Sequence, residues 1–114
     1  MANITNVLLT PGTVLTTSPV VYYTSPVATS TLLKKLTISN TTATPATAQI
    51  YLVPSAGSPV AANNILPTTT VGALSTLEVY VAENQMIPTG GTLQASAGTA
   101  AALTIFASGI QILN

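Results

Sequence analysis

The sequence predicts an all-β protein, an antiparallel β-sandwich or jelly roll of about seven to eight short strands. Three observations predict this class: short runs alternate apolar and polar residues with a period of two, Gly, Pro and Asn turns separate these runs, and no segment has the spacing of a strong amphipathic helix. Thr and Val are abundant, and their β-branched side chains suit a pleated surface. A chain of 114 residues has the length of one domain.

The N-terminal third divides into an arm and two short strands. Residues 1–12 show no clear period and end at the turn Pro11-Gly12. We therefore expect an N-terminal arm, either free or paired with a neighbouring subunit, before a single sandwich domain over 13–114. Residues 13–17 predict a short strand. Pro19 and Pro26 bracket a second run, which is expected at a sheet edge because proline lacks the N–H that a central ladder requires.

The clearest pattern runs from residue 30 to residue 54 and predicts a hairpin. Asn40 and Pro45 belong to a polar turn in which the chain is expected to reverse, because Asn hydrogen-bonds its own backbone and Pro blocks helix continuation. On each side of this turn, apolar residues occupy every second position. The expected inward residues are Leu36, Ile38, Ala46, Ala48, Ile50 and Leu52.

The C-terminal half predicts three further strands. Residues 60–66, before Pro67, are expected to form one helical turn or a packed loop, because the segment is too short for an independent helix. Alternation predicts strands over 77–81, 92–97 and 101–112, with Gly109 as a bulge. In the first of these strands the expected inward residues are Leu77, Val79 and Val81. The last strand places Leu103, Ile105 and Ala107 on one face and Thr104, Phe106 and Ser108 on the other.

Charge is scarce in this chain: 4% of the residues are charged, 47% are hydrophobic and the net charge is zero. A surface with so little repulsion tends to associate, so we expect a homo-oligomer, such as a closed ring or trimer, that persists in about 1 M sodium chloride. The lack of a basic patch argues against nucleic acid as a partner. With no secretory signal and no apolar run of ~18 residues, the sequence predicts synthesis in a cytoplasm and no membrane partner.

The sequence contains no His, Cys or Asp, which excludes a Ser-His-Asp triad, a Cys-His dyad and a zinc site. We therefore expect no enzymatic activity, no cofactor and no bound metal. The two carboxylates, Glu78 and Glu83, form an acid–base pair only if the fold brings them together. Otherwise they are solvated or pair with a lysine.

Two lysines are candidate interface residues. Lys34 and Lys35 are adjacent, so a regular strand directs one to each face. Lys34 then shares the side of Leu36 and is expected at the rim of the sandwich or against a glutamate, while Lys35 faces outward. The functional interpretation is a contact with an acidic neighbouring subunit, and the alternative is plain solvation.

The four tyrosines are the other candidate interface residues: Tyr22, Tyr23, Tyr51 and Tyr80. Tyr51 and Tyr80 lie opposite the predicted core face of their strands. Aromatic side chains of this kind are typical of protein interfaces, cross-strand pairs or sugar-binding platforms. We favour an interface or cross-strand pairing over carbohydrate binding.

From residue 26 to residue 112 the order of segments resembles small virion structural proteins of tailed bacteriophages. The matching features are a strand over 33–40, the run Ala-Gln-Ile-Tyr-Leu-Val-Pro at 48–54, the run 61–66, the turn and strand over 87–97, and a terminal strand with Ser-Gly-Ile at 108–110. The chain departs from that pattern in two places, where acidic residues are replaced by Ile110-Gln111 and by Gly91. The resemblance implies a single β-sandwich module carried on a phage head, neck or tail.

The predicted function is therefore that of a phage virion structural protein. We expect a capsid decoration or cement protein, or a neck-associated subunit, that is located in the virion and assembles with itself and with major capsid, connector or tail proteins. One alternative is a tail or baseplate component that binds a carbohydrate or receptor. A second alternative is a non-viral surface-layer or filament subunit.

Overall fold

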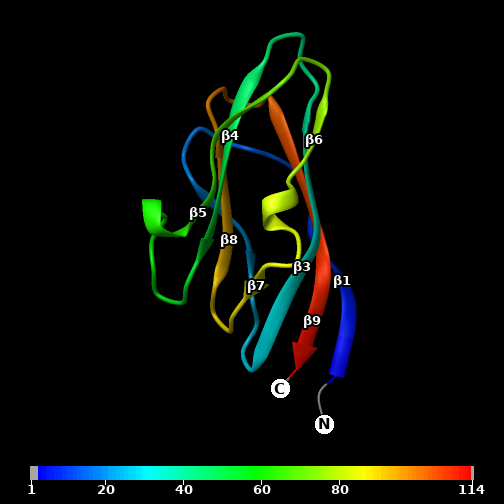
Figure 1. Cartoon of the computed structure of the whole chain (residues 1–114), viewed down its shortest axis with the longest axis vertical. Coiled ribbons are helices and arrows are strands. Elements are labelled where there is room, and N and C mark those ends of the chain that lie inside the picture. The colour runs from blue at the N-terminus through cyan, green and yellow to red at the C-terminus, as the bar shows by residue number, and fades with distance from the viewer. Residues whose placement is uncertain (1–2, 114) are drawn as a thin grey trace.

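The computed structural model describes residues 3–113, which form two antiparallel sheets packed face to face (Figure 1). Sheet A has the order β1-β9-β3-β6, with the short strand β7 also paired with β3, and sheet B has the order β2-β8-β4-β5. The strands are β1 (Asn3–Val14), β2 (Val20–Thr24), β3 (Thr29–Asn40), β4 (Ala46–Val53), β5 (Asn64–Val71), β6 (Thr76–Glu78), β7 (Met86–Ile87), β8 (Thr92–Ala97) and β9 (Leu103–Leu113). Two 3₁₀ turns are η1 (Ala61–Asn63) and η2 (Tyr80–Ala82).

The strand pairing is that of a jelly roll. Strands β4 and β5 pair with each other, and outward from this hairpin β3 pairs with β6, β2 with β8 and β1 with β9, as in one long folded ribbon. The ribbon is rolled so that β3 also pairs with β9 and β4 with β8, which joins its two halves into the two sheets. The predicted antiparallel sandwich is confirmed, and the order of the strands specifies the jelly-roll form of it.

The core lies between the sheets and is built from the alternation read in the sequence. Leu36, Ile38 and Ile105 of sheet A are fully buried. Sheet B contributes both large and small buried side chains, among them Ile50, Leu93 and Ala95. The inward side chains of the two sheets together form the core of the sandwich.

The predicted hairpin over residues 30–54 is wrong, although both of its strands exist. β3 belongs to sheet A and β4 to sheet B, so the turn between them crosses from one sheet to the other. Asn40 stabilises this crossing through its buried side chain: its Nδ2 donates to the carbonyl oxygens of Thr44 (2.9 Å) and Val71 (3.1 Å), and its Oδ1 accepts from the backbone N–H (2.9 Å) and hydroxyl (2.7 Å) of Thr42. Val71 ends β5, so Asn40 links the two sheets.

The predicted division into an arm over 1–12 and a domain from residue 13 does not match the strand bounds. β1 starts at Asn3, crosses that boundary and pairs along its length with β9 of the same chain. Met1 and Ala2 lie outside the described residues. Removal of residues 1–11 would therefore take most of an edge strand from sheet A, which destabilises the domain itself.

Two further segments, around residues 60–71 and 76–82, have strand bounds that differ from those predicted by the alternation of apolar and polar residues. β6 ends at Glu78, and the chain then turns through η2, which leaves Val79 buried but Val81 half exposed instead of inward. The helical turn expected within 60–66 is η1, but the following strand β5 was missed. Its Pro67 argues against a central strand, and β5 is indeed at a sheet edge, as is β2 between Pro19 and Pro26.

Candidate assembly surface

The outer face of sheet A carries a group of large apolar side chains among polar ones. Side chains on this face come from positions that alternate with the buried ones, and residues paired across neighbouring strands share a face, as Leu8 and Ser108 or Leu32 and Ile110 do. We call this surface the apolar face and define it by Ile4, Leu8, Val14, Leu32, Met86, Phe106, Ile110 and Ile112. Ile4 is 68% exposed and Leu8 63%. Apolar exposure of this extent on one face is typical of an interaction surface.

Phe106 is held in place on this face by the strand beside it. A Cβ built on Gly12 of β1 would lie 2.6 Å from Cζ of the Phe106 ring, so the ring lies directly over a position without a side chain. Even so, Phe106 is about half exposed. Its outer surface is therefore available to a partner, while its inner surface packs on β1.

A bulge in β3 directs both lysines outward. Leu33 pairs with Gly109 and Lys35 with Ser108, so Lys34 is an extra residue without an opposite partner in β9. Because of this extra residue, Leu33 and Leu36 are both fully buried and both lysines are exposed. The expectation that a regular strand sends one lysine to each face is wrong. The bulge predicted at Gly109 of β9 lies instead in β3, next to the residue that pairs with Gly109.

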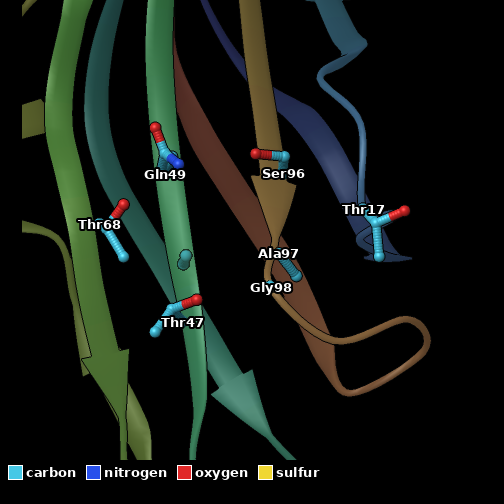
Figure 2. A pocket seen from close by; sticks show the side chains of 8 residues that line it. Thr17, Thr47, Gln49, Thr68, Ser96, Ala97 and Gly98 are labelled. Atoms are coloured by element: carbon cyan, nitrogen blue, oxygen red, sulfur yellow. The ribbon is translucent and has the colours of Figure 1, made fainter.

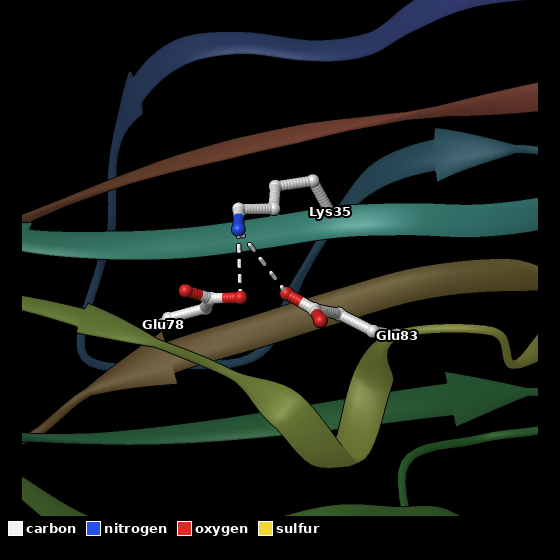
Figure 3. Close-up of polar contacts among 3 residues, drawn as sticks. All are labelled: Lys35, Glu78 and Glu83. Atoms are coloured by element: carbon white, nitrogen blue, oxygen red, sulfur yellow. Dashed lines mark hydrogen bonds and ion pairs between the residues drawn. The ribbon is translucent and has the colours of Figure 1, made fainter.

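Three of the four charged residues of the chain meet on the outer side of sheet A (Figure 3). Lys35 Nζ lies 2.7 Å from Glu78 Oε2 and 3.9 Å from Glu83 Oε2. β6 places Glu78 opposite Thr37 of β3, and η2 then returns the chain so that Glu83 reaches the same lysine. The fold thus brings together the two carboxylates, on either side of one cation, and this charged cluster has a net charge of minus one.

The two carboxyl groups are not equivalent. The hydrogen bond from Lys35 holds the pKa of Glu78 below its ordinary value, and the same bond raises the pKa of Lys35. The hydrogen bond with Glu78 and, after it, desolvation raise the pKa of Glu83. Within the described residues Glu83 Oε2 is buried without a hydrogen-bond donor. Glu83 is therefore the member of the pair that protonates first as the pH falls.

We predict opposite pH dependences for two neutral substitutions in this cluster. Ionised Glu78 stabilises the fold above the ordinary glutamate pKa, so Glu78→Gln should lower the free energy of unfolding near neutral pH, and this loss should vanish as the pH falls through the depressed pKa. The raised pKa of Glu83 means that the fold favours its protonated form, so Glu83→Gln should raise stability above the elevated pKa and lose this gain in acid. Urea unfolding across the pH range measures both, and differences of the same sign would contradict the assignment.

The four tyrosines do not form one platform. Tyr22 and Tyr23 are half-buried and pack on the core, and the Tyr23 hydroxyl lies 2.8 Å from Thr31 Oγ1 and accepts from Gln111 Nε2 at 2.7 Å. Tyr51 lies on the outer face of sheet B, and Tyr80, on η2, is 73% exposed. Of the six residues predicted from the sequence, the structure places Lys34 and Lys35 on the outer side of sheet A, with Tyr80 next to the charged cluster in the chain.

The apolar face itself was missed in the sequence, although a signal was present. In the strand over 101–112, Phe106 and Ile110 occupy positions that alternate with the inward residues Ile105 and Ala107, so the outward side of that strand also carries apolar side chains. Such a strand is apolar on both sides. Apolar residues on both sides are typical of a strand that is covered on both faces.

The outer face of sheet B has the opposite character. A pocket of about 190 Å³ is lined by Thr17, Thr47, Ala48, Gln49, Thr68, Ser96, Ala97 and Gly98 (Figure 2). Beside it, Gln49 Oε1 accepts from the Tyr51 hydroxyl at 2.8 Å and from Asn64 Nδ2 at 3.3 Å. The pocket is smaller than the ~300–1,000 Å³ usual for small-molecule sites. Its lining offers neutral hydroxyl and amide groups and no charge.

The described part of the chain, residues 3–113, contains no group of three or more His, Cys, Asp or Glu residues that would hold a metal ion. Within the same residues, no helix is long and apolar enough to cross a membrane.

No protein family model matches the chain, and no curated protein matches its sequence. A chain in the solved structure of infectious bursal disease virus, Gx strain, superposes with a TM-score of 0.52 at 11% sequence identity, over 98% of the present chain. The two chains share a fold. The present chain spans 32% of the length of that viral chain.

A chain in the structure of the Gt strain of the same virus has 11% identity over 97% of the present chain and 31% of its own length, but its TM-score of 0.31 is too low to indicate a common fold.

Proposed function

We propose that this protein is a structural subunit of a virus particle and acts by protein–protein assembly rather than by catalysis. The observation that carries the proposal is a jelly roll that exposes a group of large apolar side chains on the outer face of one sheet. Jelly rolls are common in viral capsid proteins, where each copy covers its neighbours. The fold shared with a chain of a virus structure supports the same role.

In its finer form, the proposal is a decoration, cement or neck-associated subunit of a tailed phage, located in the virion. The resemblance of residues 26–112 to such proteins supports this assignment. Its partners are then further copies of itself and major capsid, connector or tail proteins.

Charged substitutions on the apolar face should abolish incorporation into particles. Leu8→Glu and Phe106→Glu each place a carboxylate where apolar surface would be buried, and we expect particle binding to fall by at least about tenfold while the domain stays folded. Binding is measured by co-sedimentation of the purified variants with particles that were assembled without the wild-type protein. Folding is checked by circular dichroism.

Val27→Glu is the matched control, because Val27 is 86% exposed in the turn between β2 and β3 and does not belong to the apolar face. This variant should bind particles as the wild type does. Folded Leu8→Glu and Phe106→Glu proteins that still co-sediment at wild-type levels would contradict the role of the apolar face. Absence of the polypeptide from purified particles, by mass spectrometry, would contradict the proposed function itself.

A second candidate function is the binding of a neutral carbohydrate at the outer face of sheet B, as a tail or baseplate component would do. Gln49, Ser96 and the neighbouring Tyr51 favour it, since amide and hydroxyl groups beside an aromatic ring suit sugar hydroxyls. Binding to a glycan array should be lost in Gln49→Ala and Tyr51→Ala but kept in Tyr80→Ala, which alters an exposed tyrosine on η2. Equal binding by all three variants would exclude this surface.

A further inference from the structure

We propose that two copies of this chain associate through the apolar face about a two-fold axis parallel to the strands, so that Lys34 of each copy pairs with the charged cluster of the other. The inference rests on the proposed assembly role and names the partner as a second copy. All four charged side chains of the chain lie on this one face.

The four charges on the outer side of sheet A sum to zero, but a net negative charge and a positive charge lie at separate places on it. Lys35, Glu78 and Glu83 leave one negative charge on the β6 side of β3, where Glu83 Oε2 has no hydrogen-bond donor among the described residues. Lys34 carries the remaining positive charge. Lys34 lines a depression on the lateral side of β3 that is next to β9 and β1. The other lining residues, from β1 and β9, are Asn6, Val7, Leu8, Ser108 and Gly109.

Within residues 3–113, Lys34 makes no ion pair, and both glutamates share a single lysine. One face thus carries a positive group toward β1 and a net negative group toward β6, with apolar side chains around them. A face of this kind is complementary to itself.

The symmetry follows from this placement. When two identical faces meet about a two-fold axis that runs along the strands, the β1 side of one copy lies over the β6 side of the other. Lys34 of each copy then faces the cluster of its partner, and both pairs form at once. The contact closes at two copies, because the same patch is used by both.

The apolar side chains supply the area that such a contact requires. A standard interface buries about 800 Å² on each partner, which is about one seventh of the 5688 Å² surface of this chain. Leu8, Met86 and Phe106 are each about half or more exposed and lie on three different strands of the face. Their burial provides affinity, while the two symmetric ion pairs fix the orientation.

A charge swap tests the pairing. Lys34→Glu and Glu83→Lys should each weaken the dimer about tenfold in sedimentation equilibrium, because each change introduces two like-charge contacts per dimer. The double variant Lys34→Glu/Glu83→Lys restores opposite charges across the axis and should return to within about threefold of the wild-type Kd. Lys34→Gln, a neutral control, should weaken the dimer less than Lys34→Glu.

The inference is overturned if the wild-type protein stays monomeric at high concentration, if the single variants dimerise normally, or if the double variant is weaker than either single one. The same variants are assayed for co-sedimentation with particles. Unchanged dimerisation in the charge variants, together with loss of particle binding in Leu8→Glu, would remove the two-fold pairing and leave the proposed virion role in place.

Discussion

Gly109→Ala should destabilise the domain by about 3 kcal/mol or more, or prevent its folding. A Cβ at this position would overlap the carbonyl oxygen of Leu32 and lie 3.1 Å from Cδ1 of Leu9, closer than side-chain carbons normally pack. The first of these neighbours is backbone and cannot rotate away. β9 is central in sheet A between β1 and β3, and the bulge in β3 lies next to Gly109, so relief would require a shift of β3 against β9.

The matched control is Gly72→Ala, in the turn that follows β5. The nearest atom to its added Cβ would be Ser75 Oγ at 3.4 Å, an ordinary contact, so its free energy of unfolding should change little. Thermal and urea unfolding of both variants measures the difference. A Gly109→Ala protein as stable as Gly72→Ala would show that β3 and β9 can separate at the bulge without cost.

Asn40→Ala should cost about 3 kcal/mol of stability, a large effect for the loss of one polar side chain. The substitution leaves the carbonyl oxygens of Thr44 and Val71 and the backbone N–H of Thr42 without the partners that they have at the crossing between the sheets. Buried groups without partners cost about 1–3 kcal/mol each. The Asn40→Asp variant keeps the acceptor but loses both donated bonds, so it should also be destabilised.

Asn63→Ala provides the matched control. Asn63 Oδ1 accepts a hydrogen bond from the Val60 N–H at 3.0 Å, and Asn63 Nδ2 donates one to the Ser58 carbonyl oxygen at 2.9 Å. Both of these hydrogen bonds lie at the surface. Water replaces such partners, so the loss should stay within about 1 kcal/mol. Equal losses in Asn63→Ala and Asn40→Ala, measured by urea unfolding, would show that burial at the crossing adds nothing.

The inward side of most strands could be predicted from the sequence, because burial with a period of two is a local property of an extended chain. Leu36 and Ile38 in β3 and Ala46 and Ala48 in β4 are all buried as expected. The edge position of β2, between its two prolines, was predictable for the same local reason: a residue without an N–H cannot serve in a central ladder.

The candidate site could be predicted only in part. The exposed position of Lys35 follows from alternation in β3, but Lys34 faces outward because of a bulge, and a bulge depends on the partner strand. The meeting of Glu78 and Glu83 at Lys35 requires η2 and joins residues 43 positions apart. No local pattern encodes that contact.

The sequence by itself determined that the chain forms β-strands, which side of most of them faces inward, and that very little charge is present. Only the tertiary structure decided which strands pair. The turn after Asn40 is compatible both with a hairpin and with a crossing between sheets, and the crossing forms because β3 pairs with β9 and β4 with β8. These partners lie far away in the chain, and the free energy that selects them comes from burial between two complete sheets, which no single segment contains.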